Sequence, residues 1–416
     1  MIKNIIACVC SFFLATMTLA CAASAEAKEP TEGKGVNPMV VLAYDGTGDF
    51  GPETPGTKTA GWQEALDYCV QSKQDLYVKG GYGGLKAIYH VNDTIRVPPA
   101  QDFRIDGGVY VINWEGPADK DLMLVDSAMN CEYHFGILVY GGTGAGMRVR
   151  PEKPVPIDGF PVVVETIIQS EGIADPSPFT PGERKAGTGL VFDGAEASIA
   201  SSNFYFAGVL NFHTCIETRG VFQYNRLECP HLHTNADNST LFQMGDGSLG
   251  NDFRLVIGVD QGATGVTGVV AYGDRNVIDL AVRPSNAPFP PGRALVLTEP
   301  AEGNQINLIA FDDGDLSEAI TDNAVLPSNQ VTWAGPPLPI RTVNATADRF
   351  TYEQRLYPAT VRVVGGEVTD IALVRGETSL DCDKACGQDI LLSVGDRLII
   401  ESVVAPVLYV VPFKTK

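Results

Sequence analysis

Four short stretches of this chain begin with asparagine and continue with alternating apolar residues: residues 225–229 read NRLEC, 251–255 read NDFRL, 276–280 read NVIDL and 304–308 read NQINL. These asparagines are 26, 25 and 28 residues apart, and Ser202 fits the same slot one repeat earlier. A second column of apolar strands keeps the same period. Its leading residues are Leu190, Ile216, Phe242, Val269 and Leu295. Two columns with one period predict a chain that returns to the same angular position every turn.

The predicted fold is all-β: a right-handed parallel β-helix with coils of about 26 residues, because leucine-rich repeats are shorter and propeller blades are longer. Its strands would stack about 4.8 Å apart. We expect the asparagines to form a ladder, each adopting the left-handed conformation at a corner and bonding the next asparagine. Alternation along the strands assigns the two faces. Leu227, Phe253, Ile278 and Ile306 should point inward with Cys229, Leu255, Leu280 and Leu308, and Glu228, Arg254, Asp279 and Asn307 should point outward.

Both ends of the repeat region carry different patterns. Residues 59–70 place Trp62, Ala65, Leu66, Cys69 and Val70 on one stripe, which predicts an amphipathic helix capping the first coil. Beyond Arg341 the repeat stops, and we expect a small antiparallel β domain with hairpins turning at Gly365-Gly366 and Gly395-Asp396. The expected organisation is therefore a signal peptide at 1–25, a linker at 26–40, the parallel β-helix domain at 41–345 and a C-terminal β-rich domain at 346–416.

The first residues have the order of a secretory signal peptide. Lys3 is followed by the apolar stretch 5–19 and by Ala23-Ser24-Ala25, so we expect cleavage after Ala25 and a secreted or periplasmic protein. Lipidation at Cys21 is the less favoured alternative, because Thr18 stands where a lipobox usually has leucine. No later run approaches the roughly 20 apolar residues of a membrane span.

Charge and cysteine content narrow the possible partners. Without Lys3 the chain has 30 − 1 = 29 basic and 50 acidic side chains, a formal charge of −21, which disfavours nucleic acid as a partner. Six cysteines remain after cleavage, and they allow 15 pairings. We expect a local bridge between Cys382 and Cys386, and the other pairings stay open. The oligomeric state is also open.

The segment 45–69, DGTGDFGPETPGTKTAGWQEALDYC, followed by QDLYVKGG at 74–81, IYHVNDTIRVP at 88–98 and DFRIDGG at 102–108, resembles the rhamnogalacturonase and epimerase-like branch of the pectate-lyase-like superfamily. This resemblance implies a right-handed parallel β-helix and a polysaccharide hydrolase, lyase, epimerase or tailspike enzyme. The family's acidic turn is replaced here by residues 49–54, and no polygalacturonase catalytic motif matches.

One outward column carries candidate catalytic groups. Glu228, Arg254 and Asp279 occupy equivalent positions on three coils, so the carboxylates of Glu228 and Asp279 would lie about 10 Å apart. This distance lies at or slightly above the roughly 6.5–9.5 Å that separates the carboxylates of inverting glycosidases, and far from the roughly 5 Å of retaining ones. A glycoside hydrolase is the favoured activity, and it would act with inversion if these two residues are the catalytic pair. The alternative is a surface ion-pair ladder that stabilises the fold by about 0.2–1 kcal/mol per pair.

Further polar residues surround this column in the sequence. His231 and His233 share one face of a strand and are candidates for acid–base work. Candidate substrate-binding residues are Glu217, Arg226, Tyr205, Tyr272 and Arg283. A hydrolase of this kind requires no cofactor and no metal. Two alternatives remain, namely a lyase that neutralises a uronate carboxylate with arginine or Ca²⁺, and a noncatalytic glycan-binding protein.

Overall fold

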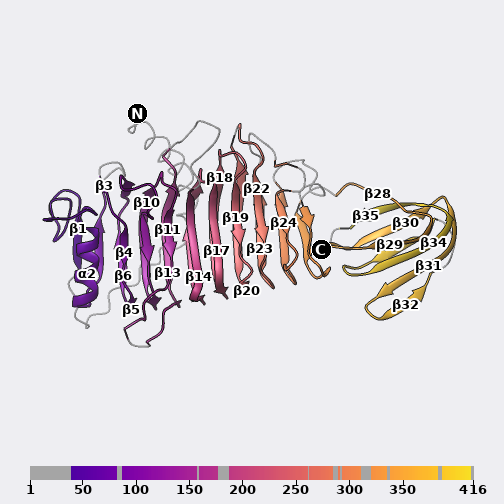
Figure 1. Cartoon of the computed structure of the whole chain (residues 1–416), viewed down its shortest axis with the longest axis horizontal. Coiled ribbons are helices and arrows are strands. Elements are labelled where there is room, and N and C mark those ends of the chain that lie inside the picture. The colour runs from indigo at the N-terminus through magenta and orange to yellow at the C-terminus, as the bar shows by residue number, and fades with distance from the viewer. Residues whose placement is uncertain are drawn as a thin grey trace, which may run out of the picture.

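The computed structural model describes residues 39–413, apart from 82–86, 157–158, 177–186, 261, 284–288, 291–292, 311–319, 335–337 and 383–386. The expected signal peptide, nearly all of the expected linker, and Cys386 lie outside the described residues. The described chain forms an elongated stack of parallel strands followed by a smaller antiparallel unit (Figure 1). The prediction of an all-β parallel β-helix with a C-terminal antiparallel β domain is therefore confirmed.

Two parallel sheets run along the solenoid, and we call them sheet A and sheet B. Sheet A contains, in spatial order, β1 (Val40–Ala43), β2 (Leu76–Lys79), β6 (Arg104–Gly107), β10 (Glu132–Val139), β13 (Ile167–Ala174), β15 (Asn203–Phe206), β18 (Arg226–Thr234), β21 (Asp252–Val259), β23 (Val277–Val282), β25 (Gln305–Ala310) and β27 (Gln330–Ala334), with β3 (Ile88–Val91), β7 (Val111–Trp114) and β16 (Val209–Leu210) beside them.

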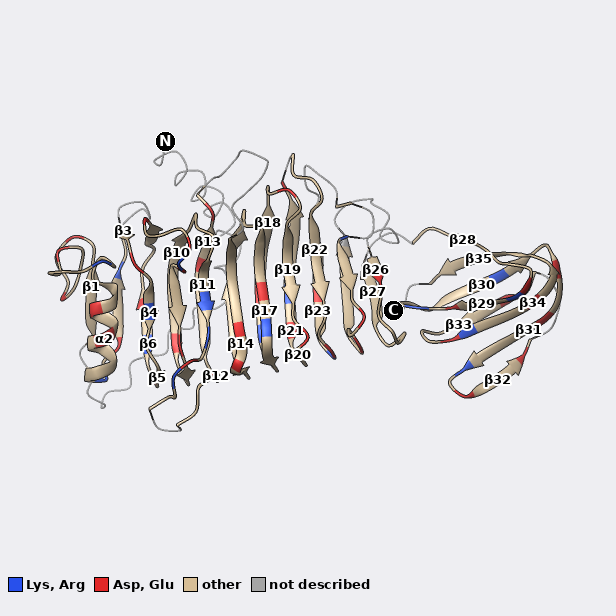
Figure 2. Ribbon diagram, in the orientation of Figure 1, with Lys and Arg blue, Asp and Glu red and all other residues tan. Residues whose placement is uncertain are grey.

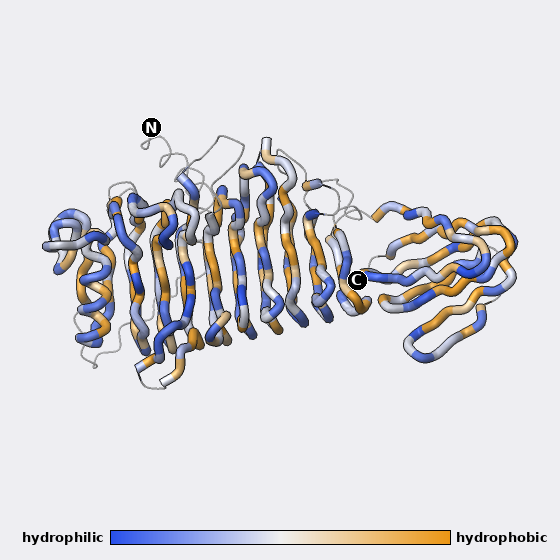
Figure 3. Tube along the Cα trace, viewed as in Figure 1, coloured by the Kyte–Doolittle hydropathy of each residue, from blue (hydrophilic) through white to orange (hydrophobic). Residues whose placement is uncertain are grey.

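Sheet B contains β4 (Ile95–Val97), β8 (Met123–Val125), β11 (Ala145–Val149), β14 (Thr188–Ala200), β17 (Thr214–Gln223), β19 (Thr240–Met244), β22 (Thr267–Ala271), β24 (Leu295–Leu297) and β26 (Ile320–Asp322), with β5 (Ala100–Gln101), β9 (Ala128–Met129), β12 (Val162–Val164) and β20 (Ser248–Leu249) beside them. Apolar and polar residues alternate along these strands (Figure 3). The predicted inward residues of sheet A, such as Leu227, Phe253 and Ile278, are fully buried. The core is thus a stack of apolar columns between the sheets.

An asparagine ladder fixes the corner between sheet B and sheet A. The side-chain oxygen of Asn251 accepts the backbone N–H of Asn225 at 2.9 Å, and its amide donates to Phe222 O and to Asn276 Oδ1, each at 2.9 Å. The same pattern continues through Asn304 to Asn329. Ser202 extends it at the other end, since its N–H donates to Asn225 Oδ1 at 3.0 Å. The predicted ladder is confirmed, with one more member than the sequence analysis identified.

The backbone at this corner differs from the prediction in one respect. The left-handed conformation belongs to the residue before four of the ladder asparagines, at Tyr224 (φ 56°), Gly250 (φ 66°), Arg275 (φ 53°) and Gly303 (φ 65°). The prediction that the asparagine itself is left-handed is therefore wrong. The preceding residue makes the turn, and the asparagine can then begin the strand with its side chain directed along the stack.

Replacing Asn251 with alanine is expected to lower the free energy of unfolding by about 3 kcal/mol, because two buried backbone groups, the N–H of Asn225 and the carbonyl of Phe222, lose their partner. Urea unfolding followed by circular dichroism measures the change. Asn307→Ala is the matched control, because that side chain points outward and its loss should cost less than about 1 kcal/mol. Equal losses in the two variants would contradict the structural role of the ladder.

The amino-terminal end of the solenoid is covered by α2 (Trp62–Ser72), which stands at one end of the stack in Figure 1. Trp62, Ala65, Leu66 and Cys69 are buried, in agreement with the predicted apolar stripe, and Val70 packs partly buried against the same core. An open end of a solenoid exposes unpaired strand edges and apolar core, so this helix removes a site of aggregation.

The C-terminal unit is a sandwich of two antiparallel sheets. One contains β28 (Arg341–Asn344), β35 (Val407–Pro412), β30 (Ala359–Val364) and β33 (Asp389–Leu392), and the other contains β29 (Asp348–Glu353), β34 (Arg397–Val404), β31 (Glu367–Arg375) and β32 (Thr378–Asp381). Antiparallel pairing thus begins at Arg341, a few residues before the expected boundary at 345/346.

Both predicted hairpins of this unit are wrong. β30 pairs with β35 and β33, whereas β31 pairs with β34 and β32. Gly365-Gly366 and Gly395-Asp396 therefore carry the chain from one sheet to the facing sheet. Alternation and a glycine turn predict two strands, but they do not specify that the two strands pair with each other.

A short segment of the sandwich, residues 354–357 between β29 and β30, packs against the last coil of the solenoid. Leu356 forms a parallel bridge with Gln330 of β27, and Arg355 pairs with the nearly buried Asp322 of β26 at 2.8 Å. This segment covers the second open end of the stack.

No described helix has the length and apolar character needed to cross a membrane. Cys69, Cys131, Cys215, Cys229 and Cys382 are free thiols, and the partner expected for Cys382 lies outside the described residues.

Candidate functional site

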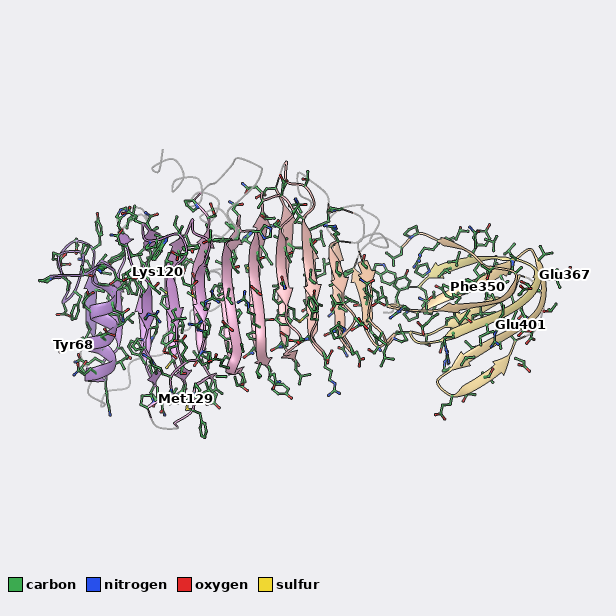
Figure 4. The ribbon with its side chains drawn as sticks, in the orientation of Figure 1. Tyr68, Lys120, Met129, Phe350, Glu367 and Glu401 are labelled. Atoms are coloured by element: carbon green, nitrogen blue, oxygen red, sulfur yellow. The ribbon has the colours of Figure 1, made fainter. Side chains whose placement is uncertain are left out.

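A polar groove lies on the outer face of sheet B across its first five strands. Its cavity volume is about 500 Å³. Figure 2 shows acidic and basic bands on β11, β14 and β17 in this region, and Lys120, labelled in Figure 4, lies on the loop before β8. The charged lining residues are Arg96, Lys120, Arg148, Arg150 and Arg219 together with Asp93, Asp119, Asp121 and Asp193. Basic residues thus outnumber acidic ones locally in a chain of net charge −20.

Five side chains across four coils form a chain of alternating charge. Arg148 donates from Nε and Nη2 to both oxygens of Asp121, at 2.6 and 3.2 Å, and from Nη1 to Asp193 at 3.5 Å. Arg219, in register with Asp193, donates to both oxygens of Glu217 at 2.7 and 2.8 Å. We call this set, Asp121, Arg148, Asp193, Arg219 and Glu217, the charge chain.

The charge chain lies over an apolar floor. Register places Leu124, Arg148, Val191 and Glu217 in one outward column, yet Leu124 is only 3% exposed and Val191 only 1%. Neighbouring side chains therefore shield these two apolar residues from solvent. The side chains of Arg148, Asp193 and Glu217 are correspondingly 15, 11 and 14% exposed. Electrostatic interactions in the groove are therefore screened far less than on an open surface.

The two arginines of the charge chain stay fully charged. Burial alone would lower the pKa of Arg148, but its hydrogen bonds to Asp121 and the charges of Asp121 and Asp193 raise the pKa above the ordinary value. The hydrogen bonds and charge of Glu217, with a smaller contribution from Asp193, raise the pKa of Arg219 against the opposing effect of burial. Both guanidinium groups thus supply fixed positive charge beside the carboxylates of the groove.

The predicted column on sheet A exists in the expected register. Tyr205, Glu228, Arg254 and Asp279 face one another on successive strands, and Asn307 follows. This face is open, because the side chains of Glu228, Arg254 and Asp279 are 38, 46 and 38% exposed.

The members of this column are occupied by ion pairs. Arg226 donates to Glu228 at 3.1 Å, while Arg254 bonds Asp252 at 3.2 Å and lies 3.9 Å from Asp279. Asn307 donates to the other oxygen of Asp279 at 2.7 Å. Of these ion pairs, Arg254–Asp279 runs between strands of the predicted column, whereas Arg226–Glu228 and Arg254–Asp252 join residues of one strand.

The two predicted histidines lie beyond an irregularity in the strand. The register of β18 with β21 shifts between Cys229 and Leu232, so His231 and His233 follow a bulge and not the flat part of the strand. Their ring centroids are 6.1 Å apart, as expected for residues sharing a face. Burial, followed by the charges of Arg283 and His233, lowers the pKa of His231 to about 4. Arg283 directly follows Val282, which is in register with Ile257, and Ile257 precedes the Gly258 that pairs with His233.

Protein stability is expected to fall as the pH falls from about 6.5 to about 4, with His231 as one cause. Its pKa in the folded state lies below the value of 6.5 expected in the unfolded chain, so the unfolded state binds more protons in this window. Urea unfolding at several pH values should show a shallower dependence for His231→Gln than for the wild type. Parallel curves for the two proteins would show that His231 does not contribute.

The remaining predicted residues fall on the other sheet. Glu217 belongs to β17, and Tyr272 follows β22, both in sheet B. The structure therefore does not bring them together with Glu228 or the histidines. Asp121, Arg148 and Asp193 were missed by the sequence analysis. Applying the same inward–outward alternation to the strands that contain Leu190 and Ile216 would have placed Asp193 beside Arg219. The alternation could not have found Asp121, because this residue lies in a loop.

Among the described residues, no three His, Cys, Asp or Glu side chains are grouped so that they could hold a metal ion.

In comparisons with known proteins, no family model and no curated protein matches this chain. One solved structure similar to it is the crystal structure of Dettilon tailspike protein (gp208). It is 10% identical over 89% of this chain and 94% of that chain, with a TM-score of 0.38.

Proposed function

We propose that this chain is a polysaccharide-active enzyme that cleaves glycosidic bonds outside the cytoplasm, with its substrate bound in the groove on sheet B. Asp193 and Glu217 are the proposed carboxylate pair of an inverting glycoside hydrolase, a reaction that requires no metal or cofactor. The observation that carries this proposal is the pair of nearly buried carboxylates held beside two arginines in an otherwise open solenoid surface. The order of charged and apolar residues in 1–25 supports export, and the pectate-lyase-like resemblance of residues 45–108 supports a polysaccharide substrate.

The spacing of the pair suits inversion. Val191 is in register with Glu217, and Asp193 lies two residues further along the adjacent strand on the same face. One strand spacing and two residue rises separate their Cα atoms by about 8 Å. This Cα separation is compatible with carboxyl groups about 6.5–9.5 Å apart, the separation that leaves room for an attacking water in inverting enzymes.

The two carboxylates differ in their contacts, which supports different roles. Both oxygens of Glu217 accept hydrogen bonds from Arg219, so this group is fixed in orientation and suited to direct a water molecule. The only hydrogen bond of the Asp193 side chain to a described residue is the 3.5 Å contact with Arg148. We therefore assign Asp193 the position facing the glycosidic oxygen and Glu217 the position facing the water.

The arginines of the groove support binding of sugars. Planar guanidinium groups donate pairs of parallel hydrogen bonds to carboxylates and to neighbouring hydroxyls. Arg96 is exposed at the groove, and its guanidinium makes no ion pair with a described residue, so its donors are available to a ligand.

The test is incubation of the purified protein with a panel of neutral and acidic polysaccharides, recording reducing ends and the ultraviolet absorbance of unsaturated products together. We expect new reducing ends without absorbance. NMR of the first product should show the anomer opposite to that of the cleaved linkage. Reducing ends with absorbance would replace hydrolysis by elimination. Binding without either signal across the panel would replace catalysis by glycan binding.

A further inference from the structure

A second cavity lies where the last coil of the solenoid meets the sandwich, and Figure 2 shows β26 and β27 at this end of the stack. Its volume is about 570 Å³. The solenoid contributes residues of β25, β26 and β27, and the sandwich contributes residues of β28, β29 and the segment 354–357. Pockets that bind small molecules measure about 300–1,000 Å³ and occur preferentially between domains, so this cavity has the size and the position of a ligand site.

The side of the cavity formed by sheet A is apolar. Leu308 and Val331 are 2 and 3% exposed, and Trp333 beside them is 6% exposed. The ring of Trp333 meets the ring of Tyr357 edge to face, with the ring centroids 5.7 Å apart. Because this contact fixes both rings, the end of the solenoid core offers a rigid apolar surface to a ligand.

The rest of the lining carries charged side chains of both signs. Asp322 and Glu353 are acidic, and Arg341 and Arg355 are basic, so the two pairs leave the cavity without net charge in a chain of net charge −20. Carboxylates only accept hydrogen bonds and guanidinium groups only donate them, whereas a hydroxyl does both. An ion of either sign would meet as many like charges as opposite ones. The lining therefore suits an uncharged ligand with several hydroxyls.

These polar side chains are held in position before any ligand arrives. Gln354 is 2% exposed, and its side-chain oxygen accepts the hydroxyl of Tyr352 at 2.8 Å while its amide donates to two backbone carbonyls. Nε of Arg355 lies 2.8 Å from Asp322, and Nη1 lies 3.8 Å from Glu353. Side chains that are already ordered lose little entropy when a ligand binds.

Glu353 is the acidic residue with oxygens available to a ligand. Its side chain is 34% exposed, and the 3.8 Å contact with Arg355 is too long for a hydrogen bond. The side chain of Asp322, in contrast, is 8% exposed and lies directly against Arg355. Glu353 can therefore accept hydrogen bonds from hydroxyls in the cavity, while Asp322 holds the guanidinium beside it.

We propose that this cavity binds a neutral sugar of one or two rings. A sugar ring combines an apolar face of C–H groups with a rim of hydroxyls that donate and accept. The apolar face packs against sheet A near Trp333, and the hydroxyls bond Glu353 and Arg355. A largely apolar wall with a few fixed polar groups is the usual composition of a small-molecule site. The site shares no lining residue with the groove on sheet B and does not depend on the activity proposed there.

The test is a titration of the full wild-type chain with glucose, galactose and mannose, and with the sodium uronate of each, at constant ionic strength, followed by tryptophan fluorescence. The chain has three tryptophans, and Trp333 is the one that lines this cavity. A saturable change with at least one neutral sugar is expected, and it should disappear in Trp333→Phe. No saturable change with any of the three, or a signal that persists in Trp333→Phe, would overturn the proposal without bearing on the groove. A uronate that binds as tightly as its neutral sugar would overturn the assignment of an uncharged ligand.

A matched pair of variants tests the proposed contact. Glu353→Ala removes the exposed acceptor and should weaken sugar binding about tenfold or more, because hydrogen bonds to a charged group are the strong ones. Glu401→Ala is the control, because Glu401 is an exposed glutamate of the same sheet that lies at the far side of the sandwich from the solenoid (Figure 4). Calorimetry measures the affinities, and circular dichroism verifies the fold. Wild-type affinity in Glu353→Ala would show that the sugar binds elsewhere.

Discussion

Replacing Asp193 with asparagine is expected to lower the turnover of the cleaved polysaccharide by about 10²- to 10⁴-fold, the usual contribution of a positioned acid or base. Asparagine preserves the size of the side chain and its contact with Arg148, but it cannot exchange a proton at neutral pH. Glu217→Gln should lose activity to a similar degree, because Arg219 would no longer hold a base in position. Initial rates of reducing-end release measure both effects, and circular dichroism verifies the fold.

The control variants come from the column that the sequence analysis favoured. Glu228→Gln and Asp279→Asn alter exposed, ion-paired carboxylates of sheet A and should retain the wild-type rate. The opposite result, with full activity in Asp193→Asn and loss in Glu228→Gln, would move the active site to sheet A. Because all four substitutions exchange a carboxylate for its amide, differences among them report position and not chemistry.

The solenoid could be predicted from sequence because its contacts repeat. Asn225, Asn251 and Asn276 each make the same bonds one coil apart, so any one of them is weak evidence, but their common spacing leaves few alternatives. The same regularity predicted which side chains are buried. A periodic fold therefore converts a three-dimensional contact into a fixed distance along the chain.

The sandwich lacks this regularity, and its pairing was predicted incorrectly. Val361 and Ile371 alternate with polar neighbours as expected, yet they belong to sheets that face each other. Which strand pairs with β30 is decided by residues 389–392 and 407–412, which are distant in sequence. Local alternation does not carry this information.

The candidate site was predicted in part for a related reason. Outward residues such as Glu217 and Glu228 could be identified, but both sheets present outward charges, and spacing does not show which face is hollowed. The groove depends on Asp121, which reaches Arg148 from a loop, and on the burial of Leu124 under charged side chains. Neither feature repeats from coil to coil, so the period could not reveal them.

Replacing Arg148 with methionine is expected to lower the free energy of unfolding by about 3–5 kcal/mol, the range found when one partner of a buried ion pair is removed. The side chains of Asp121 and Asp193 are only 19 and 11% exposed, so the variant leaves two poorly solvated carboxylates without their common cation. Methionine keeps the apolar stem over the floor of the groove, so the loss reports charge and not packing. Urea unfolding monitored by circular dichroism gives the value.

Two further variants show whether this loss has the stated cause. Arg254→Met removes an arginine that is 46% exposed and pairs at 3.2 Å, so it should cost no more than about 1 kcal/mol. Adding Asp121→Asn to Arg148→Met should recover part of the loss, because a neutral amide needs no counter-charge. A loss in Arg148→Met no larger than that in Arg254→Met would mean that water solvates the groove fully. The charge chain would then not supply the weakly screened environment on which the proposed acid–base pair depends.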